Sequence, residues 1–96
     1  MGINEIIGDK RDQILAIAAQ YGAVNVRVFG SVARGDATED SDIDFLVDFE
    51  RQQSLMTLAG LHLDLEDVLG RRVDVLNAQH LRPRFAARIA GEIVLV

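Results

Sequence analysis

The segment from Asp42 to Phe49 alternates its side chains with a period of two, which is the pattern of a β-strand whose successive side chains leave opposite faces. One face would be entirely apolar, and the other would carry aspartates. The two sets are Ile43, Phe45, Val47 and Phe49 on the first face, and Asp42, Asp44, Leu46 and Asp48 on the second. The segment therefore predicts a strand with one face in the core and one face that presents carboxylates.

The remaining pattern predicts helices and strands in alternation. Apolar residues at helical spacing predict helices over residues 3–21, 54–69 and 83 to about 90. Alternating residues predict strands over residues 24–29, 42–49, 72–77 and 92–96, and residues 30–35 leave room for little more than one turn of helix. Several connections are too short for long crossovers, so an all-parallel sheet is disfavoured. We expect an α/β (α+β) fold with a small mixed β-sheet of about four strands, helices packed on it, and a single domain spanning residues 1–96.

Composition excludes several classes of protein. The chain has no cysteine, so neither a disulfide framework nor a thiolate metal site is available. The formal net charge is −5, and residues 1–50 hold ten acidic side chains against four basic ones. Nucleic-acid-binding proteins usually present a basic stripe, which is missing here, so a nucleic-acid substrate is disfavoured. No charged leader or membrane-length apolar run is visible, and we expect a cytoplasmic protein with no membrane partner.

Three aspartates are candidates for binding a divalent metal ion. Asp42 and Asp44 leave the same face of one strand, and Asp74 lies inside another strand between Val73 and Val75, where an unpaired carboxylate is costly. If the two strands are neighbours, the carboxylates converge and raise one another's pKa, a conflict that divalent cations remove. Mg²⁺ prefers carboxylate oxygens together with substrate phosphates. The alternatives are a solvated turn for Asp42 and Asp44 and a water-facing edge strand for Asp74.

The pair Gly30-Ser31 follows the strand over residues 24–29. Glycine lets the backbone approach a phosphate closely, and a serine at a helix start offers a hydroxyl and free N–H donors. A triphosphate would then lie between this turn and metal-bearing aspartates, the arrangement that in-line displacement at a two-metal site needs. Gly-Ser after a strand is usually only a turn, so the inference depends on its conjunction with the aspartates.

Gly30-Ser31, ten intervening residues and Asp42-x-Asp44 resemble the signature of the DNA polymerase beta-like nucleotidyltransferase superfamily. The longer strings Phe29-Gly-Ser-Val-Ala-Arg-Gly-Asp and Ser41-Asp-Ile-Asp-Phe-Leu-Val are similar to its minimal nucleotidyltransferase (MNT) branch. The string Gly70-Arg-Arg-Val-Asp-Val-Leu matches the place of that family's third carboxylate, here Asp74. The resemblance covers nearly the whole chain and implies the polymerase beta-like fold.

The resemblance also implies roles for the three aspartates. Asp42 and Asp44 would hold both metal ions, which we expect to be Mg²⁺. Asp74 would complete the metal site and help to activate the attacking hydroxyl. All three are therefore expected to be catalytic and metal-binding residues.

For the nucleotide, the resemblance implies that Gly30 and Ser31 bind the β- and γ-phosphates of ATP, the expected donor. Arg34 falls in the family's Gly-Ser-x-x-Arg-Gly string, and for this residue a phosphate contact and a structural salt bridge are equally open. The sequence does not fix the base of the donor nucleotide.

The length of the chain bears on the acceptor. Ninety-six residues around a nucleotide site leave little room for an acceptor pocket, so the acceptor would be held by a partner or across an oligomer interface. The family resembled commonly pairs with HEPN proteins in prokaryotic toxin–antitoxin modules. This implies an antitoxin that transfers AMP, or another nucleotide, to a tyrosine hydroxyl of a HEPN ribonuclease toxin. Two alternatives stay open: an antitoxin that inhibits its partner by binding alone, and a small-molecule nucleotidyltransferase of the aminoglycoside-modifying kind.

Other polar residues are given structural interpretations. His62 and His80 lack a second ligand at metal-binding spacing. Asp48 lies four residues after Asp44, a span of roughly 13 Å in a strand, and is interpreted as too far away to share a metal ion with Asp42. A basic face formed by Arg82, Arg84 and Arg88 is interpreted as solvated surface in preference to a docking site. The apolar end over residues 93–96 would either extend a neighbour's sheet or be covered within the monomer, so the sequence leaves homo-oligomers open.

Overall fold

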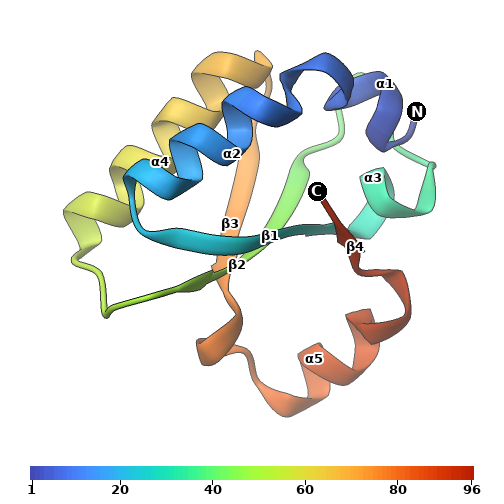
Figure 1. Ribbon diagram of the computed structural model, residues 1–96. Coiled ribbons are helices and arrows are strands. Elements are labelled where there is room, and N and C mark those ends of the chain that lie inside the picture. Colours follow the sequence, from blue (N-terminus) through green and yellow to red (C-terminus); the bar gives the residue numbers. More distant parts are fainter.

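A four-stranded sheet with helices on both faces forms the molecule (Figure 1). The computed structural model describes all residues from 1 to 96. The strands are β1 (Ala23–Phe29), β2 (Ile43–Phe49), β3 (Val73–Asn77) and β4 (Val94–Leu95). The helices are α1 (Ile3–Ile6), α2 (Arg11–Gln20), α3 (Gly30–Arg34), α4 (Leu55–Leu69) and α5 (Pro83–Ile89), with short 3₁₀ turns η1 (Gly8–Lys10), η2 (Ala78–His80) and η3 (Ala90–Glu92). None of the helices combines the length and the apolar character needed to cross a bilayer.

The order of the strands across the sheet is β3-β2-β1-β4. β1 runs antiparallel to both of its neighbours, whereas β2 and β3 are parallel and are joined through α4. The mixed sheet predicted from the short connections is therefore confirmed. In the parallel pair, Asp44 lies directly opposite Asp74.

The face of the sheet under α2 and α4 carries the main core (Figure 1). The four apolar residues predicted for one face of β2 are all buried there. They pack with Ile14 of α2 and with Leu61 and Leu65 of α4, whose side chains are no more than 2% exposed. Ser54 caps α4 by accepting a hydrogen bond from the backbone N–H of Thr57 at 3.2 Å, which fixes where the helix begins.

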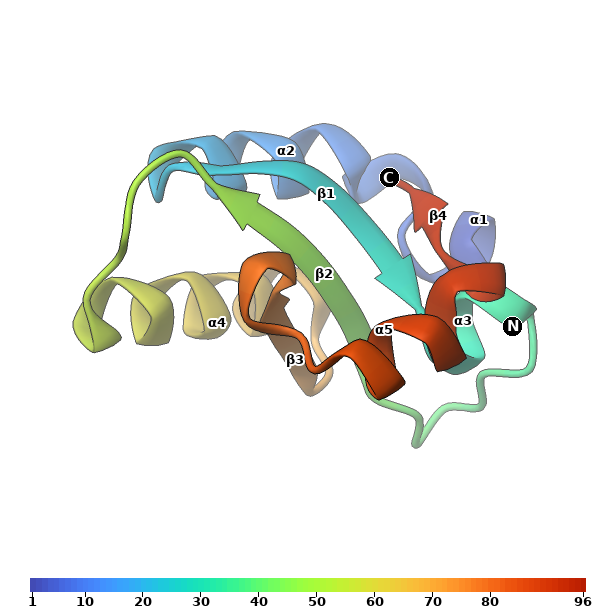
Figure 2. The same cartoon turned by 90° about the horizontal axis from the view of Figure 1, so that it is seen from below.

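The opposite face of the sheet is only partly covered. A small second core joins Phe29, Leu46 and Ile89, and the ring of Phe85 meets that of Phe29 edge-on with 5.8 Å between centroids. Figure 2 shows α5 lying across the end of the sheet where β1 stops and β2 starts, close to α3. This short helix leaves the aspartate-bearing ends of β2 and β3 accessible, which positions the functional site described below.

Three elements differ from the sequence expectation. The first helix is broken into α1, η1 and α2, because Gly8 adopts a φ of +31° that a regular helix does not contain. Asn25 has a φ of +52° and shifts the register of β1, so Val26 and Val28 face the core together with Ala23 and the simple alternation fails. The last strand is confined to two residues, since η3 occupies the chain as far as Glu92.

The structure also answers how the apolar C-terminal segment is placed. β4 pairs with β1 within the monomer through Arg27 and Val28, and Val96 is buried. The outer edge of β4 has no strand neighbour, and Leu95 is 70% exposed. The segment is thus partly covered within the monomer, and its free edge carries an exposed leucine.

The assignment of the inner face of α4 is testable with two matched leucines. Leu61 is fully buried and Leu63 is 62% exposed on the same helix. We expect Leu61→Ala to lower the free energy of unfolding by about 2–5 kcal/mol through the cavity it leaves, and Leu63→Ala to change it by roughly 0.5 kcal/mol or less. Urea denaturation followed by circular dichroism measures both. Equal losses for the two variants would contradict this packing of α4.

Candidate active site

Gly30 makes the turn between β1 and α3. Its φ is +75°, a left-handed conformation that favours glycine, and Phe29 before it is extended. A Cβ atom on residue 30 would overlap the carboxylate oxygen Oδ2 of Asp44. The backbone of the turn and the Asp44 carboxylate can approach each other only because residue 30 has no side chain.

The parallel pairing of β2 and β3 brings two of the predicted aspartates together. Asp44 and Asp74 are register partners, and Asp42 stands two residues before Asp44. Asp44 is half-buried between the turn and the strands, whereas Asp74 is exposed on the outer strand β3. Ser31, next to Gly30 in the turn, lines the same hollow as Asp44. The residues predicted from the sequence therefore gather at one end of the sheet.

Electrostatics at this end of the sheet disfavour a charged Asp44. Burial raises the pKa of the Asp44 carboxyl from 3.8 to about 6, with further contributions from the charge of Asp74, a hydrogen bond shared with Asp74, and the charges of Asp42 and Glu92. An ionised Asp44 at neutral pH is thus surrounded by like charges. A bound cation would relieve this repulsion, so the site favours cation binding.

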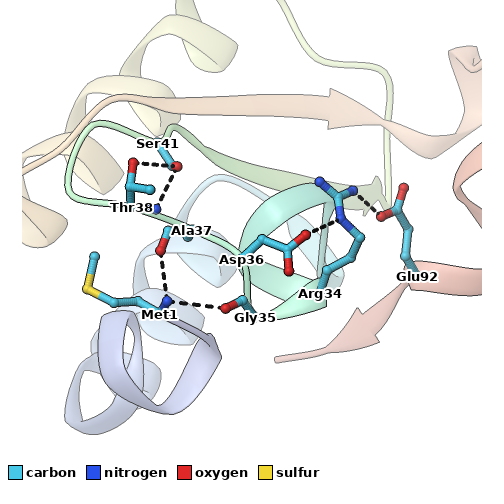
Figure 3. Close-up of polar contacts among 8 residues, drawn as sticks. All are labelled: Met1, Arg34, Gly35, Asp36, Ala37, Thr38, Ser41 and Glu92. Atoms are coloured by element: carbon cyan, nitrogen blue, oxygen red, sulfur yellow. Dashed lines mark hydrogen bonds and ion pairs between the residues drawn. The ribbon is translucent and has the colours of Figure 1, made fainter.

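Asp42 has a different partner in the structure. Its Oδ1 lies 3.1 Å from Nε of Arg72, the residue that precedes β3, and the side chain of Asp42 is 40% exposed. The loop before it is held by Arg71, whose guanidinium donates to the carbonyl oxygens of Thr38 and Ser41 at 3.0 and 3.2 Å. Thr38 N also donates to Ser41 Oγ at 2.8 Å (Figure 3). These contacts fix the approach of the chain to β2 and hence the position of Asp42.

Arg34 occupies a carboxylate clamp. Its Nε donates to Asp36 at 3.0 Å and its Nη1 to Glu92 at 2.5 Å (Figure 3). The hydrogen bonds that the guanidinium donates to Asp36 and then to Glu92 raise its pKa above the ordinary value. Of the two roles considered for Arg34, the structure contains the salt bridge, which joins α3 to η3.

A cavity of about 430 Å³ opens beside the turn and has the size of a small-ligand pocket. Its lining comes from the turn, from β2 and from the C-terminal helix: Phe29, Gly30, Ser31, Arg34, Asp44, Arg88, Ile89 and Glu92. A larger groove of about 520 Å³ lies between the N-terminal segment and β4, but it contains none of the three aspartates. The smaller cavity is therefore the candidate site for phosphate chemistry.

Two residues from the C-terminal part of the chain join this site. Glu92 was not singled out from the sequence, and Arg88 was interpreted there as solvated surface, whereas the structure places both in the cavity lining because the C-terminal part folds back over α3. The pairing of Asp42 with Arg72 follows from the parallel register of Ile43 with Val73, which places the preceding residues side by side. Assuming an in-register parallel pair would have revealed this contact in the sequence.

The donor atoms of the site suit Mg²⁺. No three acidic or histidine side chains are gathered closely enough to enclose a metal ion on their own. Mg²⁺ in phosphoryl-transfer sites is usually held by one or two carboxylates with substrate phosphates and water, so the substrate itself supplies ligands. Asp44 and Asp74 present hard oxygens in this arrangement, and Asp42 would have to exchange its ion pair with Arg72 for the metal.

The other polar residues lie away from the cavity. His62 pairs with Glu66 within α4 at 3.2 Å, and His80 lies in η2. Asp48 accepts one hydrogen bond from Asn25 at 3.0 Å, and its Oδ2 lies 3.2 Å from Arg27 Nη2. None of these three residues lines the cavity that holds Asp44.

Known proteins of similar sequence and structure bear on this site. A family model described as nucleotidyltransferase domain matches residues 11–96. Protein adenylyltransferase MntA of Thermococcus cleftensis is 43% identical over 77 residues, which cover 80% of this chain and 78% of that protein. A solved structure of a candidate minimal nucleotidyltransferase is 45% identical, superposes with a TM-score of 0.85, and matches 100% of this chain and 97% of its own.

A more distant structural neighbour shares the fold alone. It is a chain from the complex of a tri-AMPylated Shewanella oneidensis HEPN toxin with an MNT antitoxin, at 15% identity and a TM-score of 0.67. The match covers 88% of this chain and 66% of that chain. The sheet and helix arrangement is thus preserved at low sequence identity.

The close approach of Gly30 and Asp44 gives a first expectation for the site. In Gly30→Ala the new Cβ would both strain the left-handed backbone and displace the Asp44 carboxylate. We expect a loss of about 1–3 kcal/mol in unfolding free energy and loss of Mg²⁺-dependent ATP binding. Gly91→Ala, where a Cβ meets no atom within 4 Å, is the matched control. Retention of full stability and binding in Gly30→Ala would refute the contact.

The raised pKa of Asp44 gives a second expectation, for metal-free protein. Because the folded-state pKa of about 6 exceeds the value of 3.8 for an unperturbed carboxyl, Asp44 contributes stability below pH ~4 that is lost as the pH rises through 6. Asp44→Asn should remove this loss and stabilise the protein at pH 8 by about 1 kcal/mol, a value reduced for solvent screening at the half-exposed site. Thermal melts in EDTA at pH 3.5 and pH 8 measure the difference. A variant stabilised equally at both pH values would argue against Asp44 as the source.

Proposed function

The chain belongs to the nucleotidyltransferase domain family, and on this premise we propose that it transfers AMP from ATP to a hydroxyl group of a HEPN-type toxin, thereby acting as an antitoxin. The observation that carries the proposal is the placement of Asp44 beside Asp74 across the parallel strands, with the Gly30-Ser31 turn against Asp44. The relative named protein adenylyltransferase supports protein as the acceptor class.

The proposed reaction is a single displacement at the α-phosphate of ATP. The acceptor oxygen forms a new bond to the α-phosphorus, the bond from that phosphorus to the oxygen bridging to the β-phosphate breaks, and pyrophosphate leaves. The proton of the acceptor hydroxyl passes to the carboxylate of Asp74, which lies beside Asp44 and is open to solvent. Such a reaction needs positioning and charge neutralisation more than covalent participation by the protein.

The residues of the site would divide this work. Asp44 and Asp74, with Asp42 after its release from Arg72, would hold Mg²⁺, which when bound neutralises phosphate charge. The backbone of Gly30 and the hydroxyl of Ser31 would bind the β- and γ-phosphates from the other wall of the cavity. Arg34 would hold α3 against η3 through its two carboxylate partners and so keep this wall in place.

The position of Asp74 is compatible with a macromolecular acceptor. β3 is an edge strand and Asp74 is exposed, so an acceptor can reach its carboxylate from solvent. A hydroxyl carried on a partner protein can approach there without a dedicated acceptor pocket. The HEPN toxin in complex with the MNT antitoxin of Shewanella oneidensis, a structure that shares this fold, supports the class of partner proposed.

One observation favours a second candidate function, inhibition by binding alone. Leu55 and Met56, neighbours at the start of α4, are both 83% exposed, and Leu63 of the same helix is also largely exposed, so α4 offers apolar side chains to a partner. An antitoxin that masks its toxin by complex formation would use such a surface. The two functions make different demands on Asp44, since binding through α4 does not involve it.

Mass spectrometry of the proposed HEPN-type partner separates the two functions. After incubation with the purified chain, ATP and Mg²⁺, we expect the partner to gain the mass of one or more AMP units. Asp44→Asn should abolish the gain, because it removes a metal ligand, while size-exclusion chromatography still shows the complex. Asp48→Asn is the same isosteric change at a residue further along β2 that does not line the cavity, and it should leave the gain unchanged. An unmodified partner in a stable, neutralised complex would reject the transfer reaction in favour of binding.

A further inference from the structure

Two arginines line the cavity beside Asp44, and they differ in their partners. Arg34 donates to Asp36 and Glu92, so its charge is already matched by two carboxylates. Arg88 of α5 forms no ion pair or hydrogen bond with the rest of the protein. The cavity thus contains one guanidinium that is committed within the fold and one that is free to meet a ligand.

Arg88 is positioned by a contact with an aromatic ring and not by an ion pair or a hydrogen bond. Its guanidinium carbon lies 5.1 Å from the centroid of the Phe85 ring, one turn earlier in α5, within the range of a cation–π interaction. Phe85 in turn packs edge-on against Phe29, the residue before Gly30. A chain of two aromatic contacts therefore connects the backbone of the turn to the free guanidinium. This contact restrains Arg88 without consuming its hydrogen-bond donors.

The charges of the cavity show what the free guanidinium suits. Asp44 stands on one wall, and the charge of Glu92 is matched by Arg34, so no carboxylate of the cavity lining is paired with Arg88. ATP brings several negative charges on its β- and γ-phosphates, more than Mg²⁺ held by carboxylates neutralises. Arginine binds phosphate oxygens through parallel N–H donors, which suits it to the terminal phosphates.

We propose that Arg88 is a triphosphate-binding residue, positioned by Phe85 to donate hydrogen bonds to the β- and γ-phosphates of the donor nucleotide. The inference rests on the proposed function, because it takes ATP as the ligand of the cavity. It goes further by assigning phosphate recognition to α5, outside the Gly30-Ser31 turn. It also assigns Arg34 and Arg88 different tasks, one holding the walls of the cavity together and the other binding the ligand.

If Arg88 binds the terminal phosphates, its substitution should affect the binding of ATP and not that of AMP. A residue that contacts the β- and γ-phosphates contributes to binding of ATP and leaves binding of AMP, which lacks those groups, unchanged. We expect Arg88→Ala to weaken ATP binding in the presence of Mg²⁺ by about tenfold or more and AMP binding by less than about twofold. Arg88→Lys keeps the charge but loses the planar donor pair and should lie between Arg88→Ala and the unaltered protein.

Two further variants control for charge and for packing. Arg84→Ala removes an exposed arginine of the same helix that does not line the cavity, and it should leave ATP binding unchanged. Phe85→Leu keeps an apolar side chain but removes the aromatic face under Arg88, and it should weaken ATP binding by a smaller factor than Arg88→Ala. Circular dichroism melts of all four variants establish that each is folded before binding is compared.

Isothermal titration calorimetry with ATP and with AMP on the isolated chain decides the inference. If the unaltered chain fails to bind ATP with Mg²⁺, the proposed function itself fails. If the unaltered chain binds ATP and Arg88→Ala binds it equally well, the function stands and the role of Arg88 is overturned. An equal loss of ATP and AMP affinity in Arg88→Ala also overturns it, since Arg88 would then act on a part of the nucleotide other than its terminal phosphates.

Discussion

The structure depends on the parallel, in-register pairing of β2 with β3, which sets the carboxylate of Asp44 beside that of Asp74. Two like charges at the edge of a sheet oppose folding unless a proton or a cation lies between them, and this conflict adds to burial in raising the pKa of Asp44. The crossover through α4 makes the pairing parallel, and its buried leucines hold it in place. Packing on one face of the sheet thus maintains the repulsion between carboxylates on the other face, and this repulsion would favour the Mg²⁺ binding proposed above.

The difference between the two faces of the sheet could be predicted from the sequence because apolar residues alternate with aspartates along most of β2. Every apolar position of its first face is buried, and Leu46 on the second face joins the small core under α5. The break at Gly8 and the bulge at Asn25 could not be predicted in the same way. Both arise from single residues with positive φ, and the spacing of apolar residues along the sequence gives no information on backbone torsion angles.

The part of the site that could be predicted consists of residues that belong to short sequence motifs. Gly30, Ser31 and the aspartates were assigned from spacing and resemblance, and the structure gathers them at one end of the sheet. The side chains from α5 and η3 complete the cavity from the far end of the sequence, and only the tertiary fold brings them there. The ion pair of Asp42 with Arg72 likewise requires knowledge of the strand register.

The absence of a side chain at residue 30 also restricts how this sequence can change over evolutionary time. Gly30 and Asp44 occupy each other's space, so their tolerated substitutions are coupled. Any side chain at position 30 displaces the Asp44 carboxylate, whereas a change at position 44 leaves the Gly30 turn in place. The dependence therefore runs in one direction: a descendant of this chain that keeps Asp44 in its present position must keep Gly30, but one that loses Asp44 can still retain the glycine.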